Sequence, residues 1–330
     1  MAKVAVLGSG SWGLALAVEL YQNSHDVTVW SYTEEESKEI ETTRGSSRLP
    51  GLTLPLGLKF TSDMVEACDG ASLIVMVVPS FATRSTAQTL KDIIKPDQVV
   101  VTATKGIEEG SLMTQTDILM DVLGKDVKIG VLSGPSHAEE VCQNMPTLVV
   151  AASDDIKVAE YIQDIFMSEV FRVYTSTDMI GVEIGASLKN VIAIAAGMSD
   201  GIGYGDNAKA ALVSRAIKEM IDLVTAMGGS QDTMNGLAGV GDLMVTAFSR
   251  HSRNRMFGML MGQGLSMEEA QARVKMTVEG IYTAKAAKTL AEKYNIQMPI
   301  VDVVNEVLFE DLPVKKAVAK LMGRSKKSEF

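Results

Sequence analysis

The stretch IGASLKNVIAIAAGMS, residues 184–199, holds a single charged side chain, Lys189. At helical spacing its neighbours on the same face are mostly small: Gly185, Ala186, Ile192, Ala193 and Ala196. Another segment or a ligand can therefore approach the ammonium closely. Burial disfavours the charged form of lysine and can lower its pKa from ~10.4 by as much as 3–5 units, which would make Lys189 a proton donor and acceptor near neutral pH. The alternative is a lysine whose stem lies along apolar surface while its head stays in water.

Two clusters further along also carry groups suited to catalysis or binding. The sequence GVGDL, residues 239–243, sets the carboxylate of Asp242 in a glycine turn among apolar residues. The sequence SRHSRNR, residues 249–255, packs three arginines closely together in an acidic protein. A planar guanidinium suits a phosphate group, and the amide of Asn254 adds neutral hydrogen bonds. The second cluster therefore predicts an anion site, with a solvated basic loop as the alternative.

A glycine pattern near the N-terminus predicts a dinucleotide site. The short apolar run at residues 4–7 is followed by GSGSWG, residues 8–13, and then by the helix-forming LALAVELYQN. A GxGxxG loop needs this setting, because its glycines allow the tight turn, the close approach of a pyrophosphate and the packing of helix on strand. An ordinary glycine turn is the alternative.

The choice between NAD(H) and NADP(H) stays open. An NAD-specific site usually carries an acid at the end of the second strand, which is expected at residues 27–30, to bind the ribose 2′-hydroxyl. Ser31 and Tyr32 occupy that place. Arg44 and Arg48 follow, and either reach a 2′-phosphate or lie on the solvated surface. The sequence thus predicts tolerance of NADP(H) and use of both cofactors.

These groups need a scaffold, and the first half of the chain predicts a parallel sheet covered by helices on both faces. The expected strands are Val4–Leu7, Val27–Trp30, Ser72–Val78, Val99–Ala103, Val127–Leu132, Leu148–Ala152 and Val170–Tyr174. Ligands of such sheets bind beyond the carboxyl ends of the strands. Lys105 directly follows a buried strand, so its cation is expected to face a ligand.

The second half changes character, because strand-like runs disappear after Asp178. Helices are expected at residues 207–228, after the capping-box pattern Ser266-x-x-Glu269, and from Pro299 onward. We therefore predict an α/β N-terminal dinucleotide-binding (Rossmann-like) domain with a mostly parallel, doubly wound sheet at 1–178. An all-α C-terminal domain with the substrate and catalytic groups is predicted at 179–330.

The composition of the chain argues against nucleic-acid binding, membrane insertion and metal binding. The chain has 330 residues, of which 46% are hydrophobic and 22% charged, with a net charge of −10. Such a surface does not favour nucleic acid or anionic membrane, and no apolar run approaches the ~20 residues of a membrane span. Cys68 and Cys142 have no metal-ligand spacing, and unpaired cysteines are typical of a reducing cytoplasm. No metal is expected.

Several motifs, taken in their order along the chain, resemble those of one protein family. They are the strand end ATKG with Lys105, the turn SGPS at 133–136, GASLKNVIAIAAGMSDGIGYGDN around Lys189, GVGDL and SRNR. Together they resemble the bacterial NAD(P)-dependent glycerol-3-phosphate dehydrogenase family, nearly from end to end. The resemblance implies that Lys189 is the proton acceptor and donor, with Lys105 and Asp242 at the reacting centre.

The resemblance also implies two sets of ligand-binding residues. Those for dihydroxyacetone phosphate or sn-glycerol 3-phosphate are Lys105, Gly134, Ser136, Lys189, Asp242, Ser252, Arg253 and Asn254. Those for NADP(H) or NAD(H) are Gly8, Gly10, Ser11, Trp12, Gly13, Tyr32, Lys105, Ala138, Arg253, Val278 and Glu279. Tyr32 departs from the family, which more often has histidine or arginine at that position.

The expected activity is reversible hydride transfer that reduces dihydroxyacetone phosphate in the cytoplasm and supplies phospholipid synthesis. A homodimer is expected, because a helical second domain with much apolar surface favours self-association. One alternative is another two-domain dehydrogenase, acting on a hydroxy acid or a sugar-acid phosphate. A cofactor-binding sensor without turnover is the other, although it would not need Lys189, Lys105 and Asp242 together.

Overall fold

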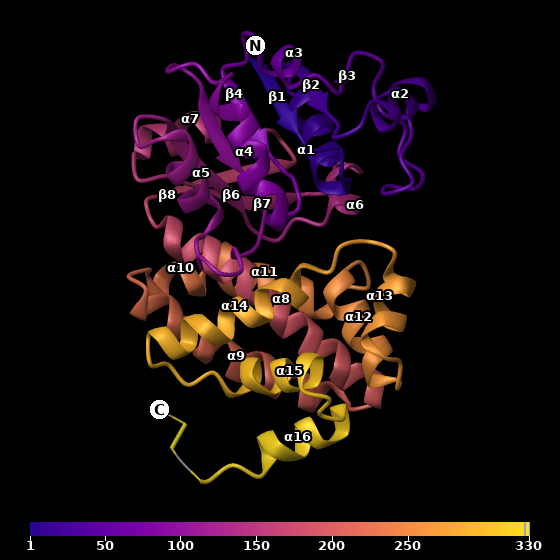
Figure 1. The fold of residues 1–330 in the computed structure, drawn as a ribbon, viewed down its shortest axis with the longest axis vertical. Coiled ribbons are helices and arrows are strands. Elements are labelled where there is room, and N and C mark those ends of the chain that lie inside the picture. Colours follow the sequence, from indigo (N-terminus) through magenta and orange to yellow (C-terminus); the bar gives the residue numbers. More distant parts are fainter. Residues whose placement is uncertain (327, 330) are drawn as a thin grey trace. The chain divides into compact units, whose positions relative to one another are not determined.

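The computed structural model describes residues 1–326 and 328–329, in two compact units (Figure 1). The first unit comprises Met1–Lys105 and Met113–Glu183, and the second comprises Gly106–Leu112 and Ile184–Phe330. The short segment Gly106–Leu112 belongs to the second unit because Ile107 is buried in its apolar core. The sequence alone assigns that segment to the first domain.

An eight-stranded sheet in the order β3-β2-β1-β4-β5-β6-β7-β8 organises the first unit. Its strands are β1 (Lys3–Leu7), β2 (Asp26–Trp30), β3 (Lys59–Thr61), β4 (Leu73–Met76), β5 (Val99–Thr102), β6 (Lys128–Ser133), β7 (Thr147–Ala152) and β8 (Phe171–Ser176). Neighbouring strands are parallel except β6 and β7. The order from β3 to β6 is that of a dinucleotide-binding fold, so the predicted Rossmann-like, mostly parallel sheet is confirmed.

One strand lies outside the sequence prediction. β3 is only three residues long and pairs with β2 at the edge of the sheet. Three residues at an edge are too few to show a periodic pattern, since average strands are about twice that length.

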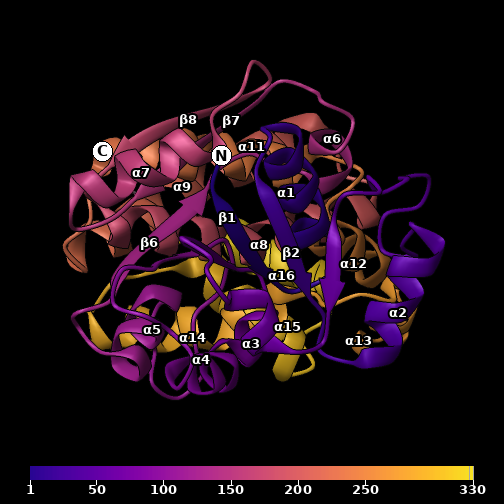
Figure 2. The ribbon, with the colours of Figure 1, turned by 90° about the horizontal axis from the view of Figure 1, so that it is seen from above.

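Alternate residues along the strands enter two separate cores. Val4 and Val6 of β1 pack in one core with helices at residues 11–22 and 156–166, whereas Ala5 and Leu7 pack in the other with helices at 64–68, 83–91 and 115–123. Figure 2 shows these two groups of helices on opposite faces of the sheet. The helices of this unit are α1 (Ser11–Gln22), α2 (Glu34–Thr43), α3 (Met64–Cys68), α4 (Thr83–Lys91), α5 (Gln115–Leu123), α6 (Ala138–Val141) and α7 (Ile156–Phe166), with the short turn η1 (Ser80–Ala82).

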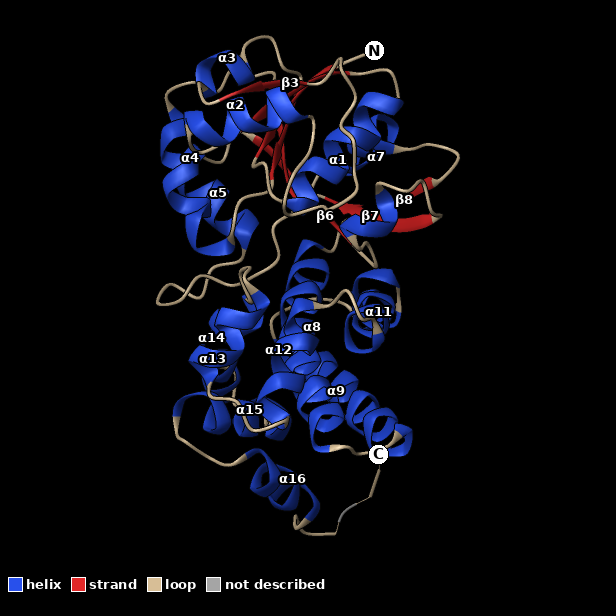
Figure 3. Cartoon of the chain, turned by 90° about the vertical axis from the view of Figure 1, so that its right-hand side faces the viewer, coloured by secondary structure: helices blue, strands red, loops and turns tan. Residues whose placement is uncertain are grey.

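In the described residues of the second unit, the regular secondary structure consists of helices joined by loops (Figure 3). Its elements are the greater part of α8 (Met179–Ile202), then α9 (Asp206–Ala226), α10 (Gln231–Asn235), η2 (Leu237–Gly241), α11 (Asp242–Phe248), α12 (Arg253–Gly262), α13 (Met267–Val274), α14 (Glu279–Lys293), α15 (Pro299–Phe309) and α16 (Val314–Met322). The predicted capping box is present, because Ser266 accepts a hydrogen bond from Glu269 N and the Glu269 carboxylate accepts one from Ser266 N. Pro299 is the first residue of α15, as expected.

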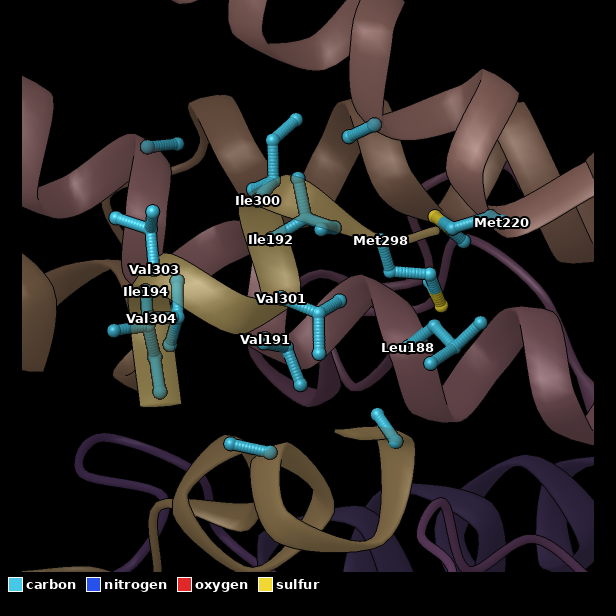
Figure 4. Packing of buried hydrophobic residues seen from close by; sticks show 14 of the residues in the cluster. Leu188, Val191, Ile192, Ile194, Met220, Met298, Ile300, Val301, Val303 and Val304 are labelled. Atoms are coloured by element: carbon cyan, nitrogen blue, oxygen red, sulfur yellow. The ribbon is translucent and has the colours of Figure 1, made fainter. Parts of the chain in front are cut away.

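Helix α8 contributes heavily to the core of the second unit. Figure 4 shows Leu188 and Val191 of α8 in one apolar cluster with Met220 of α9 and Val301 of α15. By length and composition α8 also qualifies as a membrane span, with a mean hydropathy of 1.5 over its most apolar window. That window is 89% buried inside the protein, which is the burial of a core helix.

Glycines bring the backbones of α8 and α12 into direct contact. A Cβ on Gly197 of α8 would lie 2.0 Å from Arg255 O, and one on Gly258 of α12 would lie 2.0 Å from Ile194 O. Gly201 and Gly262, each one turn further along its helix, are similarly close to the facing backbone. Only glycine permits this approach, which sets the first turn of α12 against α8.

Gly258→Ala is therefore expected to destabilise the fold. Overpacking costs about 1–3 kcal/mol, which exceeds the gain of at most about 1 kcal/mol from alanine's higher helix propensity. The urea midpoint should fall at unchanged slope. Met256→Ala, at an exposed position of the same helix, is the matched control. A Gly258→Ala midpoint equal to or above that of the wild type would show that the helices separate freely.

Candidate active site

Lys189 lies on α8 with only 6% of its surface exposed. Its Nζ donates to Asp242 Oδ1 and to Thr246 Oγ1, each at 2.7 Å. The ammonium is therefore held inside the second unit by two oxygen acceptors. The alternative of a lysine head standing in water does not describe this side chain.

Asp242 is positioned by an irregular backbone. The π-helical turn η2 runs over the glycine-rich Leu237–Gly241, and Asp242 then begins α11. Gly239 has no room for a side chain, because its Cβ would lie 2.1 Å from Met234 O. Single π turns are rare and occur frequently at functional sites. The Asp242 side chain is only 1% exposed in its ion pair with Lys189.

Thr246 is a site residue that the sequence pattern did not single out. It lies one helical turn after Asp242, and its hydroxyl donates to Asp242 O at 2.6 Å. Because its proton is directed to Asp242 O, the hydroxyl oxygen has lone pairs available to accept the hydrogen bond from Lys189 Nζ. The spacing Asp242-x-x-x-Thr246 is the available signal, because residues four apart share a helix face.

Two opposing effects act on the Lys189 ammonium. Removal from water disfavours its charge, whereas an adjacent carboxylate and two acceptor oxygens favour it. The ion pair with Asp242 and the hydrogen bond to Thr246 thus offset part of the cost of burying the ammonium.

Glu183 anchors α8 six residues before Lys189. Its carboxylate accepts from Thr116 N at 2.9 Å and from Thr116 Oγ1 at 2.5 Å, at the start of α5. Complete burial raises the pKa of Glu183 to about 7, although hydrogen bonds from the threonines oppose that shift. The Glu183 side chain thus fixes the beginning of α8 to the beginning of α5 in the first unit.

The predicted phosphate cluster begins α12. Ser252 is the N-cap, accepting from Arg255 N at 3.2 Å. Asn254 is buried and joins two other helices, since its Nδ2 donates to Asn190 Oδ1 and its Oδ1 accepts from Gly280 N, both at 2.9 Å. Asn190 directly follows Lys189, so the cluster is joined to the helix that carries Lys189.

The arginines of this cluster differ in their partners. Arg255 is held by Asp200 through Nε at 2.7 Å and Nη2 at 2.6 Å, and the same carboxylate accepts from Lys209. Arg253 is exposed, with a 3.4 Å contact from Nη1 to Thr277 O. Of these two, Arg253 therefore has the guanidinium free to turn toward an anion, while Arg255 fixes α12 to the end of α8. Val278 and Glu279 follow Thr277 as the N-cap and first residue of α14.

In the first unit, the glycine loop lies between β1 and α1. Gly8 has φ +128°, and its Cβ would lie 2.6 Å from Val77 O, while a Cβ on Gly13 would lie 1.9 Å from Gly8 O. Gly10, the N-cap of α1, has open space where a side chain would be. The indole N–H of Trp12, two residues on, is buried without a hydrogen-bond partner among the described residues. A bare backbone, a helix N-terminus and an unsatisfied donor fit a dinucleotide pyrophosphate.

The strand ends of β5 and β6 meet around one carbonyl. Lys105 Nζ donates to Gly134 O at 3.1 Å, and Ser136 Oγ donates to the same oxygen at 2.9 Å. Gly134 has φ +145° and lies tightly against Val149, so glycine is required there. Ala138 starts α6 shortly afterwards, with its side chain buried.

The comparison with protein families decides the classification. Residues 3–159 match the model of the NAD-dependent glycerol-3-phosphate dehydrogenase N-terminus, and residues 178–319 match that of its C-terminus. The chain belongs to this family.

Individual members of the glycerol-3-phosphate dehydrogenase family are similar over their whole length. A glycerol-3-phosphate dehydrogenase [NAD(P)+] of Fusobacterium nucleatum is 51% identical, with coverage of 100% of this chain and 99% of the relative. One of Agathobacter rectalis is 52% identical, with coverage of 100% and 98%. The crystal structure of a glycerol-3-phosphate dehydrogenase from Coxiella burnetii is 39% identical, with a TM-score of 0.94 and coverage of 98% of this chain and 99% of that one.

As a member of this family, the chain is an NAD(P)-dependent oxidoreductase. Its described residues contain no group of three or more His, Cys, Asp or Glu side chains that could hold a metal ion. The predicted site residues fall into one set per unit. The first unit holds the glycine loop, Tyr32 and the Lys105–Gly134–Ser136 cluster, and the second holds the segments with Lys189, Arg253 and Glu279.

Proposed function

We propose that this chain catalyses the NAD(P)H-dependent reduction of dihydroxyacetone phosphate to sn-glycerol 3-phosphate, and the reverse reaction. The observation that carries the proposal is the buried Lys189–Asp242–Thr246 cluster in a chain of this family. A charged lysine inside an apolar helical core is costly unless it is paired, and an acid–base role explains why it is there.

Lys189 acts as the general acid in the direction of reduction. When bound, the nicotinamide cofactor would supply a hydride to the ketone carbon. Lys189 Nζ donates a proton to the developing alkoxide, and in the reverse direction the neutral amine accepts that proton. Asp242 and Thr246 orient the ammonium and stabilise its charged form. Lys105 is assigned to the substrate oxygen, whose developing negative charge a cation stabilises.

Recognition of the phosphate is assigned to the start of α12. Arg253 supplies a charge-assisted contact, and Ser252 and Asn254 supply neutral groups. Gly134 and Ser136 are assigned to the same substrate. The cofactor is assigned to the glycine loop with Ser11, Trp12, Tyr32, Lys105 and Ala138, and to Arg253, Val278 and Glu279. This division leaves Lys189 to the chemistry and Arg253 to binding.

We also propose that the enzyme works in the cytoplasm as a homodimer, and that its product supplies phospholipid synthesis. The acidic charge and the unpaired cysteines support the location. Sedimentation of the purified protein tests the dimer, since a single species of 35.4 kDa would contradict it.

A spectrophotometric assay tests the proposed activity. The loss of NADPH and NADH is followed with dihydroxyacetone phosphate and with a panel of 2-oxo acids and sugar-acid phosphates. Of the substrates in this panel, we expect only dihydroxyacetone phosphate to cause rapid oxidation of the reduced cofactor. Faster oxidation with a 2-oxo acid would place the enzyme with other two-domain dehydrogenases, and no oxidation with any substrate would favour a cofactor sensor.

A further inference from the structure

The two residues that directly follow β2, Ser31 and Tyr32, offer no conventional group for the 2′ position of the cofactor ribose. Ser31 at the end of β2 is fully buried, and Tyr32 is 83% exposed, with its ring edge against Trp30 at 6.2 Å. Neither carries a charge. A residue that distinguishes a 2′-hydroxyl from a 2′-phosphate must therefore come from elsewhere.

Three cations lie between residues 31 and 50, and two of them are engaged away from the glycine loop. Lys38 pairs with Glu34 on the outer surface of α2. Arg44 donates to Leu58 O at 2.8 Å and lies over the ring of Phe60 at 5.4 Å.

Arg48 is the remaining cation, and it reaches the glycine loop. Its Nη1 contacts Ser9 O at 3.4 Å and pairs with the carboxylate of Glu36. Its side chain is 44% exposed, so part of the guanidinium faces solvent. Glu36 is in the first turn of α2, six residues after the end of β2 at Trp30. The pair therefore connects the loop expected to bind pyrophosphate with the strand end expected to bind the adenosine ribose.

We propose that the Arg48–Glu36 pair senses the 2′ position of the cofactor and lets one site accept both NADH and NADPH. The inference rests on the proposed function only in placing a dinucleotide on the glycine loop. With NADH, the Glu36 carboxylate accepts a hydrogen bond from the 2′-hydroxyl, which is the role usually given to an acid at the strand end. Arg48 stays paired with Glu36 and neutralises it.

With NADPH, the same guanidinium changes its partner. Arg48 donates to the 2′-phosphate, for which its planar fork is well suited, and Glu36 turns away because two anions repel each other. Exchange of one anionic partner for another keeps Arg48 neutralised in both states. Tyr32 carries no charge, so it contributes no ionic contact to either form of the cofactor.

Calorimetric binding of 2′,5′-ADP and 5′-AMP tests the pair without turnover. The variants are Arg48→Gln and Glu36→Gln. Glu34→Gln, which breaks the exposed Glu34–Lys38 pair on the same helix, is the matched control. In Arg48→Gln the preference for 2′,5′-ADP over 5′-AMP should fall about tenfold, the size of one charge-assisted hydrogen bond. In Glu36→Gln it should rise roughly threefold, because the phosphate no longer competes with a carboxylate.

The ratio of kcat/KM for NADPH to that for NADH should shift in the same directions, and Glu34→Gln should leave both ratios unchanged. A wild-type protein that binds 2′,5′-ADP no more tightly than 5′-AMP overturns the inference, whatever reaction it catalyses. So does an Arg48→Gln variant that loses both ligands equally. Absence of dihydroxyacetone phosphate reduction, with the Arg48-dependent preference for 2′,5′-ADP intact, would instead refute the proposed function and support the inference.

Discussion

Replacement of Lys189 by methionine is expected to lower the turnover of dihydroxyacetone phosphate at least about 100-fold, the lower limit for loss of a general acid. Binding of NADPH should remain close to that of the wild type, because Lys189 is not among the residues assigned to the cofactor. The measurement is kcat at saturating NADPH and substrate, together with calorimetric binding of the cofactor. A variant that retains more than about a tenth of wild-type turnover would show that Lys189 is not the essential acid.

Folding must be separated from chemistry in this experiment. Lys189→Met leaves the buried carboxylate of Asp242 without its cation, which typically destabilises a protein by about 3–5 kcal/mol. The double variant Lys189→Met/Asp242→Asn removes both charges, so it should recover much of the stability and none of the turnover. Recovery of turnover in the double variant would assign the loss to misfolding.

Lys209 offers a matched control within the same unit. It is also a nearly buried lysine in an ion pair, with Asp200 at 2.5 Å. In Lys209→Met the Asp200 carboxylate still has Arg255 as its partner, so the structure should hold. We expect this variant to keep most of its turnover, because no proton transfer is assigned to Lys209.

The fold of the first unit follows largely from local sequence. Buried parallel strands read as continuous apolar runs, and the residues 72–78 and 99–103 show such runs around β4 and β5. The edge strand β3 is too short to give such a pattern. The antiparallel pairing of β6 with β7 is a choice among non-local partners that strand composition does not encode.

The second unit depends more on contacts between helices. Capping patterns at Ser266 and Pro299 give helix starts, because they act within one turn. The close approach of α8 and α12 rests on the pairs Gly197 with Gly201 and Gly258 with Gly262, and each is visible as a four-residue spacing. Which two helices such spacings join is decided by packing in three dimensions.

The candidate site also has residues that local sequence indicates and residues that only three-dimensional contacts reveal. Lys189 and Asp242 stand out as a lone charge and a carboxylate in apolar surroundings, and the structure places them 2.7 Å apart. Thr246 and Asp200 do not stand out in the sequence. Their roles are visible only from the side chains that they contact in the structure, Lys189 and Arg255. The sequence leaves Arg48 either as a contact for a 2′-phosphate or as a surface residue, and its contact with Ser9 depends on the path of the chain after α2.

Truncation of Arg253 is expected to separate phosphate recognition from chemistry. If Arg253 binds the substrate phosphate as proposed, Arg253→Ala removes a charge-assisted contact. The kcat/KM for dihydroxyacetone phosphate should then fall by about 100-fold, since such contacts contribute about 1.5–3 kcal/mol and also position the ketone. Unphosphorylated dihydroxyacetone lacks the recognised group, and its low kcat/KM should be nearly the same in both proteins. Arg250→Ala is the matched control, because Arg250 is exposed in the same segment and has no assigned role.

Free phosphite gives the sharper form of this test, because it supplies the missing group as a separate piece. Binding energy from a remote group is spent on positioning the reacting atoms. Phosphite should therefore accelerate the reduction of dihydroxyacetone by the wild type and by Arg250→Ala, but not by Arg253→Ala. Cofactor is kept saturating throughout, since Arg253 is assigned to the cofactor as well. Equal damage to dihydroxyacetone and its phosphate would mark Arg253 as a structural or cofactor-directed residue. Because Asp200 already engages Arg255, the phosphate would then have to bind Arg250 or Lys105.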